Sequence, residues 1–161
     1  MKQTNRPTFY LDDDKLKPVR AGGVLFYRYD DKNDSYHLLL IYSRDNYEDF
    51  GGCSDKKDIS IEQMVAREVD EESNGIFGQQ FILENIKNAN IEPVYIKYCK
   101  YVLYFIQINE IYNPEIFGDK EICDDIERKV EWLSYDDFKT KKINFRLNTH
   151  EVLNHMKKLF V

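Results

Sequence analysis

The chain has 161 residues, 42% of them hydrophobic, and a formal net charge of −6. This length suits one domain with a proper core and is too short for two. The negative charge argues against a protein that holds nucleic acid or an acidic membrane through bulk positive charge. A polyanionic substrate would therefore need a bound cation or a few well-placed Lys and Arg residues.

Neither the N-terminal 20 residues nor any later segment contains an apolar run long enough to cross a bilayer. The cysteines, which are Cys53, Cys99 and Cys123, are odd in number, widely spaced and without a CxxC pair. We therefore expect neither a disulfide framework nor a structural zinc site. These features predict a soluble, cytoplasmic protein that makes no membrane contact, and they leave open whether it forms a homodimer.

The chain begins with a polar stretch, residues 1–18, which contains two prolines and three consecutive aspartates. We expect this stretch to form an arm or a short edge element ahead of a single domain over residues 19–161. Two segments rich in β-forming residues follow, 21–29 and 36–43, and the turn-forming sequence DDKNDS joins them. They predict an antiparallel hairpin.

Helical and extended patterns follow one another over the rest of the chain. Residues 59–73 have a helical period, and residues 94–108 alternate with the period of a half-buried strand. A further strand is expected over 130–135, with a short helix starting directly after it. Apolar residues at helical spacing predict a C-terminal amphipathic helix over 148–161. This order predicts an α/β fold with a mixed β-sheet between helices.

The helix over residues 59–73 places three glutamates on its apolar face. At 100° per residue, three apolar residues and three glutamates lie within about 60° of Glu68. This stripe consists of Ile61, Met64, Val65, Glu68, Glu71 and Glu72. The opposite face, where we expect solvent, consists of Gln63, Ala66 and Asp70. A charged surface helix is the alternative interpretation, but neighbouring like charges cost roughly 0.2–0.5 kcal/mol per pair, and more when partly buried.

A hard divalent cation is the simplest compensation for these charges. Mg²⁺ and Mn²⁺ prefer oxygen ligands and commonly bridge carboxylates to substrate phosphates. Gly51 and Gly52, ahead of the helix, allow a backbone carbonyl to approach a ligand closely, although a simple turn or bulge would also explain them. Arg67 lies about 100° from Glu68. We therefore expect it to pair with Glu71 or with Asp58 rather than with Glu68.

The stretch from Gly52 to Gly75 resembles the signature of the Nudix hydrolases. That signature is Gly, five residues, Glu, seven residues, and then Arg-Glu-aliphatic-any-Glu-Glu-any-Gly-aliphatic; residues 67–73 read REVDEES. The hairpin before this stretch and the segment ERKVEWLSYDDF after it are similar to the family's flanking strands, so the resemblance covers residues 19–138. It implies a Nudix-like α/β/α sandwich.

The sequence departs from the signature at its first glutamate, at its last glycine and in one spacing. Asp58 replaces the first glutamate, and eight residues instead of seven separate it from Arg67. We expect Asp58 to be the N-cap of a helix that starts at Ile59 or Ser60. Asn74 stands in the glycine position, which a left-handed helix terminus tolerates. All three glutamates are retained, so we expect activity.

The resemblance implies metal-dependent attack of water on a diphosphate linkage in a nucleoside diphosphate attached to another group. Mg²⁺ or Mn²⁺ is the implied cofactor. The implied metal ligands are Gly52, through its carbonyl, and Glu68, Glu71 and Glu72. The position of the general base varies within the family; the candidates are Glu71 and an acidic residue of the later loop. In that loop Glu127 is the best placed, because it precedes the strand that begins at Val130, and Asp124 and Asp125 are its rivals. Arg67 is counted with the catalytic residues.

Substrate recognition is less specified by the sequence. Candidates for phosphate contacts are Arg20, Arg44, Lys97 and Lys100. Three tyrosines of the long strand stack on a base or pack within the strand: Tyr98, Tyr101 and Tyr104. The basic run is a rim for a highly phosphorylated ligand or a solvated turn: Lys139, Lys141, Lys142 and Arg146. The expected partner is a small phosphorylated substrate, a nucleotide first; capped RNA, a diphosphoinositol polyphosphate and non-catalytic nucleotide sensing are the alternatives.

Overall fold

The computed structural model describes residues 5–161, so residues 1–4 of the expected arm lie outside the described part. Its centre is a mixed sheet of seven strands. These strands are β3 (Ala21–Asp30), β4 (Ser35–Ser43), β5 (Asn46–Glu48), β6 (Phe50–Cys53), β7 (Val94–Ile96), β8 (Tyr101–Gln107) and β11 (Lys129–Ser134). The main order is β11-β4-β3-β8-β7, with β5 beside β4 and β6 beside β3. Only β3 and β8 run parallel among these pairs.

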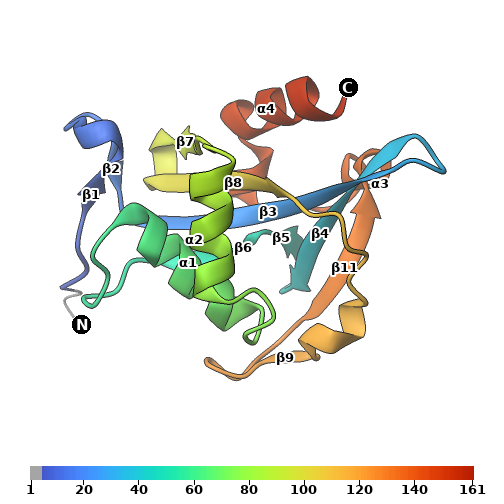
Figure 1. Cartoon of the computed structure of the whole chain (residues 1–161), viewed down its shortest axis with the longest axis horizontal. Coiled ribbons are helices and arrows are strands. Elements are labelled where there is room, and N and C mark those ends of the chain that lie inside the picture. The colour runs from blue at the N-terminus through green and yellow to red at the C-terminus, as the bar shows by residue number, and fades with distance from the viewer. Residues whose placement is uncertain (1–4) are drawn as a thin grey trace.

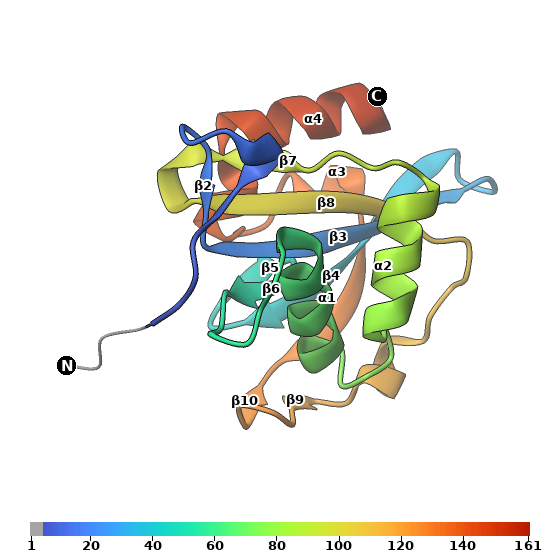
Figure 2. The ribbon, with the colours of Figure 1, turned by 60° about the vertical axis from the view of Figure 1, so that its left-hand side comes forward.

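Helices cover both faces of this sheet. They are α1 (Ile61–Glu72), α2 (Gln79–Asn88), α3 (Tyr135–Phe138) and α4 (His150–Phe160). Figure 1 and Figure 2 show α1 and α2 on one side of the sheet and α4 on the other. Successive residues of β3 point to opposite faces, as the pleat requires. Val24 and Phe26 pack in the core under α1, whereas Leu25 and Tyr27 pack in the core under α4. The predicted α/β/α sandwich with a mixed sheet is confirmed.

Two small hairpins lie outside the central sheet. β1 (Phe9–Tyr10) pairs with β2 (Pro18–Val19) in the expected arm, and Phe9 packs against the core under α1. β9 (Lys120–Glu121) pairs with β10 (Ile126–Glu127) ahead of β11, and Figure 2 shows this hairpin below α1. No helix within residues 5–161 is long and apolar enough to cross a membrane.

Helix α1 begins two residues later than the expected helix and has a different cap. The Ser60 side chain accepts a hydrogen bond from the backbone N–H of Gln63, so Ser60 is the N-cap and the prediction of Asp58 in that role is wrong. At the other end, Asn74 has φ 52° and Gly75 has φ 81°, which confirms the left-handed terminus. Ala66 is buried, contrary to expectation, because α2 packs on that side of α1.

The segment over residues 94–108 is a hairpin and not the single strand that we expect from its pattern. β7 pairs antiparallel with β8, and the chain turns at Lys97–Cys99 and at Lys100, which has φ 53°. Tyr98 is therefore 86% exposed at the tip of the turn, although the alternation places it with Ile96. Helix α2 is a further difference, because the sequence pattern predicts no helix over Gln79–Asn88.

The sheet divides along one edge of β3, and this division makes room for a cleft. The first half of β3 pairs with β6, through Gly22 opposite Gly52 and Gly23 opposite Gly51. The second half, from Phe26 onward, pairs with β4 instead. β4 and β6 therefore separate from each other near the middle of β3. The C-terminal end of β4 pairs with β5 instead of with β3.

Candidate active site

A cleft of about 390 Å³ lies where β4, β5 and β6 diverge. Gly52, Glu68 and Glu72 all line it, so the structure brings together three of the four implied metal ligands. The fourth, Glu71, is not among the lining residues. The other lining residues are Ile41, Ser43, Arg44, Glu48, Gly51, Cys53, Glu121, Asp124, Ile126, Arg128 and Arg146.

Helix α1 delivers its glutamates to this cleft because its apolar face is anchored. Ile61, Met64 and Val65 are buried in the core under the helix, as the stripe predicts. The same stripe continues past the end of the apolar packing and reaches the cleft at Glu68 and Glu72. The position of the carboxylates thus follows from the phase of the helix.

Glu72 is the more buried of the two cleft glutamates of α1. One of its oxygens, Oε1, accepts a hydrogen bond from the backbone N–H of Gly51 at 3.3 Å. Burial raises the pKa of Glu72 well above its usual value, and the carboxylates of Glu48, Asp49 and Glu121 act in the same direction. A cation in the cleft would favour the charged form that burial disfavours.

Glu68 lies directly over Gly52. A Cβ atom on Gly52 would overlap the Glu68 carboxylate, so only glycine leaves room for it. Burial raises the pKa of Glu68 to about 7, while the neighbouring Arg67 opposes this shift. At neutral pH, this carboxyl group is therefore close to the midpoint of its titration.

Arg67 connects the loop before α1 to two of the glutamates. Its guanidinium pairs with Asp58 at 2.8 Å, with Glu71 at 3.2 Å and with Glu68 at 3.1 Å. It also donates to the Cys53 carbonyl at 3.0 Å. The predicted pairing with Asp58 and Glu71 is confirmed, whereas the expectation that Arg67 does not serve Glu68 is wrong.

Behind the cleft lies a buried ionic cluster of three residues from distant parts of the chain. Asp49 is fully buried and accepts hydrogen bonds from the Tyr101 hydroxyl at 2.5 Å and from Arg146 Nε at 2.7 Å. The Arg146 guanidinium also lies over the Tyr101 ring, 4.9 Å from its centroid. Burial acts to lower the pKa of Arg146, but the Asp49 carboxylate raises it. No local sequence pattern distinguishes Asp49, and Tyr101 lies in a strand, as its alternating pattern predicts.

The β9–β10 hairpin closes one side of the cleft. Its Glu121 is 8% exposed and lines the cleft with Asp124, whereas Glu127 and Asp125 do not. Burial raises the pKa of Glu121, and Asp124 adds to this effect. Asp125 is exposed and pairs with Lys120. Sequence reasoning identified this loop but missed Glu121, which belongs to a charged hairpin without a distinguishing pattern.

Two side chains hold this hairpin against the end of α1. The Asn74 amide donates to the carbonyls of Phe117 and Lys120 at 2.8 Å each, and its oxygen accepts from the Ile122 N–H. Arg128 donates to the Glu72 carbonyl at 2.9 Å. Asn74 therefore does more than replace glycine at the helix terminus, because it also fixes the loop that carries Glu121.

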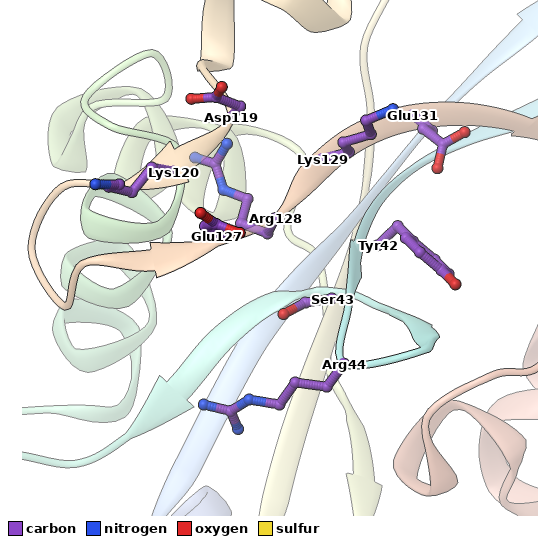
Figure 3. A pocket seen from close by; sticks show the side chains of 9 residues that line it. All are labelled: Tyr42, Ser43, Arg44, Asp119, Lys120, Glu127, Arg128, Lys129 and Glu131. Carbon is purple, nitrogen blue, oxygen red and sulfur yellow. The ribbon is translucent and has the colours of Figure 1, made fainter.

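A second, larger pocket of about 760 Å³ adjoins the cleft and shares Ser43, Arg44 and Arg128 with it. Figure 3 shows its nine lining side chains; Arg44 and Tyr42 extend in opposite directions from the end of β4. Glu127 lines this pocket and not the cleft. Of the phosphate-binding candidates Arg20, Arg44, Lys97 and Lys100, Arg44 lines the cleft, where it is exposed; Arg146 of the basic run lines it too.

The other predicted substrate contacts lie outside the cleft lining. Arg20 donates to the Arg6 carbonyl, and its own backbone N–H donates to the Lys100 carbonyl. Lys100 is exposed at the β7–β8 turn, next to Tyr98. The Tyr98 ring meets the ring of Phe145 edge to face, with 6.2 Å between the centroids. Tyr101 and Tyr104 are buried, which settles the open question for these two tyrosines in favour of packing.

Comparison with known proteins identifies the fold. The chain is similar to an Ap4A hydrolase of C. elegans in a binary complex (TM-score 0.58, 15% identity, covering 87% of this chain and 97% of that one). It is also similar to the NUDIX domain of Shewanella oneidensis NrtR complexed with ADP ribose (TM-score 0.54, 16% identity, 88% of each chain). A second C. elegans Ap4A hydrolase structure matches with a TM-score of 0.52 at 15% identity, over 88% of this chain and 97% of that one. The chain has the Nudix fold.

No protein-family model matches the sequence, and no curated protein matches it. The Nudix fold is therefore identified through structure. In this fold, the chain places the signature-like stretch in the β6 strand, the following loop and α1, next to the cleft. Asp58, which stands at the position of the signature's first glutamate, is buried and pairs with Arg67.

The donor set of the cleft suits a hard divalent cation. The carboxylates of Glu68 and Glu72 and the backbone of Gly52 offer only oxygen ligands. Among residues 5–161, no three Asp, Glu, His or Cys side chains are grouped closely enough to hold a metal ion. Arg67 holds Glu68 and Glu71 in ion pairs. Binding a cation at Glu68 would therefore require the ion pair between Glu68 and Arg67 to open.

Proposed function

We propose that the chain is a metal-dependent hydrolase that cleaves a diphosphate linkage in a nucleoside diphosphate linked to another group. One observation carries this proposal: α1 extends its core-facing stripe into a cleft with Glu68 and Glu72, two carboxylates whose pKa values burial raises. Charged groups in such a position cost stability unless they serve a ligand. The cleft is also open to substrate at the division of the sheet.

Mg²⁺ or Mn²⁺ is the cation that we propose for this cleft. Glu68, Glu72 and the Gly52 carbonyl would hold it, with Glu71 joining them once it leaves Arg67. When bound, the cation neutralises the diphosphate and lowers the pKa of a coordinated water. Arg67 fixes the loop before α1 through Asp58 and so keeps Gly52 and Glu68 adjacent.

A proton acceptor is needed for the attacking water. We propose that it comes from the β9–β10 hairpin, with Glu121 and Asp124, which line the cleft, ahead of Glu127. Glu121 lines the cleft, and burial raises its pKa, which makes it a stronger base than an ordinary glutamate. Glu127, in the adjoining pocket, and Glu71, paired with Arg67, remain proposals of lower rank.

The expected substrate is a nucleotide derivative. Arg44 lines both the cleft and the adjoining pocket and would contact phosphate at their junction. Tyr98 and Phe145 are 86% and 57% exposed and form an aromatic pair on which a base would stack. Similarity to an Ap4A hydrolase and to an ADP-ribose-bound domain supports a nucleotide. The three unpaired cysteines suit a cytoplasmic location.

The alternatives with more highly phosphorylated substrates have less support. Lys139 and Lys141 line a separate pocket between α3 and α4, while Arg146 lines the cleft, so these basic residues do not share one rim. A nucleotide sensor without turnover is compatible with the fold, but sensing alone does not explain why Glu68 and Glu72 line the same cleft. Capped RNA and inositol pyrophosphate therefore enter the experiment as competing substrates.

The test is a substrate panel with Mg²⁺ or Mn²⁺, with products identified by mass spectrometry. The panel contains Ap4A, ADP-ribose, nucleoside triphosphates, a cap nucleotide, capped RNA and an inositol pyrophosphate. We expect cleavage of a nucleoside diphosphate derivative, and a loss of more than about a hundredfold in Glu72→Gln. Glu84→Gln on the exposed side of α2 is the matched control. Ligand-induced thermal stabilisation without any product would favour the sensor, and full activity of Glu72→Gln would refute the proposed site.

A further inference from the structure

Arg146 differs from the other members of its basic run. Lys139, Lys141 and Lys142 are exposed, whereas the side chain of Arg146 is 17% exposed. The short 3-10 turn Phe145–Asn148 directs Arg146 inward, and the Asn144 side chain caps this turn by accepting from the Arg146 N–H at 3.1 Å. The backbone therefore places this guanidinium at the wall of the cleft.

The Arg146 guanidinium contacts two residues, Asp49 and Tyr101. Its Nε donates to Asp49 Oδ1 at 2.7 Å, and one face lies over the Tyr101 ring. The Tyr101 hydroxyl donates to the other oxygen of Asp49 at 2.5 Å. Since all three partners are buried or nearly so, the orientation of the Arg146 fork is fixed before any ligand arrives.

Within residues 5–161, neither terminal nitrogen of Arg146 makes a hydrogen bond. Arg146 lines the same cleft as Glu68 and Glu72. Arg128 also lines the cleft, but its terminal nitrogens donate to the carbonyls of Phe117, Gly118 and Glu72. Arg146 is therefore a cation that Asp49 holds in place and that has N–H donors without partners among residues 5–161. Arg44, in contrast, is exposed at a turn.

Neutralisation of Asp49 explains only part of this arrangement. A single Nε–H donor together with the Tyr101 hydroxyl satisfies the Asp49 carboxylate, and the remaining four N–H donors of the fork have no protein partner. A planar fork with free donors matches two oxygens of a phosphate. Glu48 and Glu72 line the same cleft, and the charge of Arg146 acts on both carboxylates, but within residues 5–161 neither forms an ion pair with its terminal nitrogens. The fork thus keeps donors for a further anion.

We infer that Arg146 binds a phosphate group of the substrate with its two terminal nitrogens. Phe145 precedes it in the chain and forms the exposed aromatic pair with Tyr98. A base stacked on that pair would lie against the residue that directly precedes Arg146 in the chain, so we assign to Arg146 the 5′-phosphate of the same nucleoside. The ligand class is therefore a nucleoside 5′-phosphate derivative. This inference rests on the proposed function, which supplies phosphate as the ligand of the cleft.

The test measures binding and not turnover. Isothermal titration calorimetry compares α,β-methylene-ADP, which the proposed chemistry does not cleave, with adenosine, both in the presence of Mg²⁺. The variant Asp49→Asn with Arg146→Gln removes both charges and keeps polar side chains at both positions. We expect its affinity for α,β-methylene-ADP to fall about ten- to a hundredfold, with the affinity for adenosine unchanged. Lys87→Gln, on the exposed surface of α2, controls for the loss of one positive charge.

An unchanged affinity of the double variant for α,β-methylene-ADP, with thermal unfolding like that of the wild type, would overturn the inference. So would a wild-type protein that does not bind this probe. If the double variant does not fold, NMR of the wild-type arginine side chains decides instead: the terminal N–H signals of Arg146 should shift with α,β-methylene-ADP and not with adenosine, and unshifted signals overturn it. A chain that binds the probe through Arg146 but cleaves no diphosphate would refute the proposed function alone.

Discussion

Arg67 closes the loop in front of α1 by donating from Nε and Nη2 to the two oxygens of Asp58, at 2.8 and 3.0 Å. Asp58 has no side-chain exposure, and the Arg67 side chain is 16% exposed. Although burial opposes it, hydrogen bonding from Arg67 lowers the pKa of Asp58. This bidentate pair ties Asp58, which stands where the Nudix signature has its first glutamate, to the arginine that precedes the glutamates of α1.

Breaking this pair should destabilise the protein strongly. Arg67→Ala leaves a buried Asp58 carboxylate without its partner and brings Glu68 and Glu71 into unshielded repulsion. We expect a loss of roughly 3–5 kcal/mol in the free energy of unfolding, measured by urea denaturation. The control is Lys139→Ala, which breaks an exposed ion pair with Asp136 and should change stability by less than about 1 kcal/mol. Equal effects of the two substitutions would contradict the role of Arg67.

The parts of the site that the sequence predicted are those with a local pattern. The glutamates of α1 share their phase with Ile61 and Val65, and a helical period can be read within one segment. Asn74 signals a left-handed terminus by residue type. The fold class followed from the order of such segments. The glutamate stripe and the helix terminus can each be read within about four turns of helix.

The rest of the site depends on contacts between distant segments. Asp49 and Arg146 are 97 positions apart, and no local pattern connects them. The turn at Lys97–Lys100 carries no Gly, Pro or Asn, so the alternating pattern on both sides of it reads as one strand. Ala66 is buried in one core cluster with Ile82 and Ile86 of α2, a helix that the sequence pattern does not predict. Tertiary packing decided these positions.

Gly51 and Gly52 should respond differently to substitution by alanine: Gly51→Ala should lose stability, whereas Gly52→Ala should keep its stability. A Cβ on Gly51 would overlap the Tyr101 hydroxyl and the backbone of Gly22 and Gly23. Since that backbone cannot yield, Gly51→Ala should lower the melting temperature strongly or prevent folding. A Cβ on Gly52 would meet only the mobile end of the Glu68 side chain.

Gly52→Ala should therefore fold and lose activity. We expect a melting temperature within a few degrees of the wild type, since the Glu68 carboxylate can turn away, and a fall in kcat/KM of about a hundredfold because that carboxylate leaves the cleft. Circular dichroism and the hydrolysis assay check the two halves of the prediction. An active Gly52→Ala protein would show that Glu68 does not act from its present position.

Glu68 should give the unfolding free energy a pH dependence of known sign. Burial raises its pKa to about 7 in the folded protein, against a usual value of 4.5. Between these values, the folded chain keeps a proton that the unfolded chain releases, so the stabilisation is complete below pH 4.5 and is lost as the pH rises through 7. Burial also raises the pKa of Glu72, which acts in the same direction.

Urea unfolding in EDTA should therefore show a fall in the unfolding free energy between pH 5 and pH 8, on the order of 2 kcal/mol. The lowered pKa of Asp58 places its titration below this window. Glu68→Gln should flatten the slope, and saturating Mg²⁺ should oppose it by binding the charged carboxylates. A slope that is identical in Glu68→Gln would assign the effect to other groups.

The exposed aromatic pair should control affinity for the base and not for phosphate. Tyr98 and Phe145 come from the β7–β8 turn and from the turn before α4, and their rings meet edge to face. If a base stacks there, Tyr98→Ala and Phe145→Ala should each weaken binding of the nucleotide substrate by roughly 1–3 kcal/mol, seen as a raised KM with little change in kcat. Tyr98→Phe keeps an aromatic ring and should restore the affinity. Binding of inorganic pyrophosphate should stay at the wild-type level in all three variants, and Tyr10→Ala in the arm controls for the loss of an exposed tyrosine. A parallel loss of pyrophosphate binding would show that the substitutions distort the Arg146 turn, and an unchanged KM would remove the pair from the substrate site.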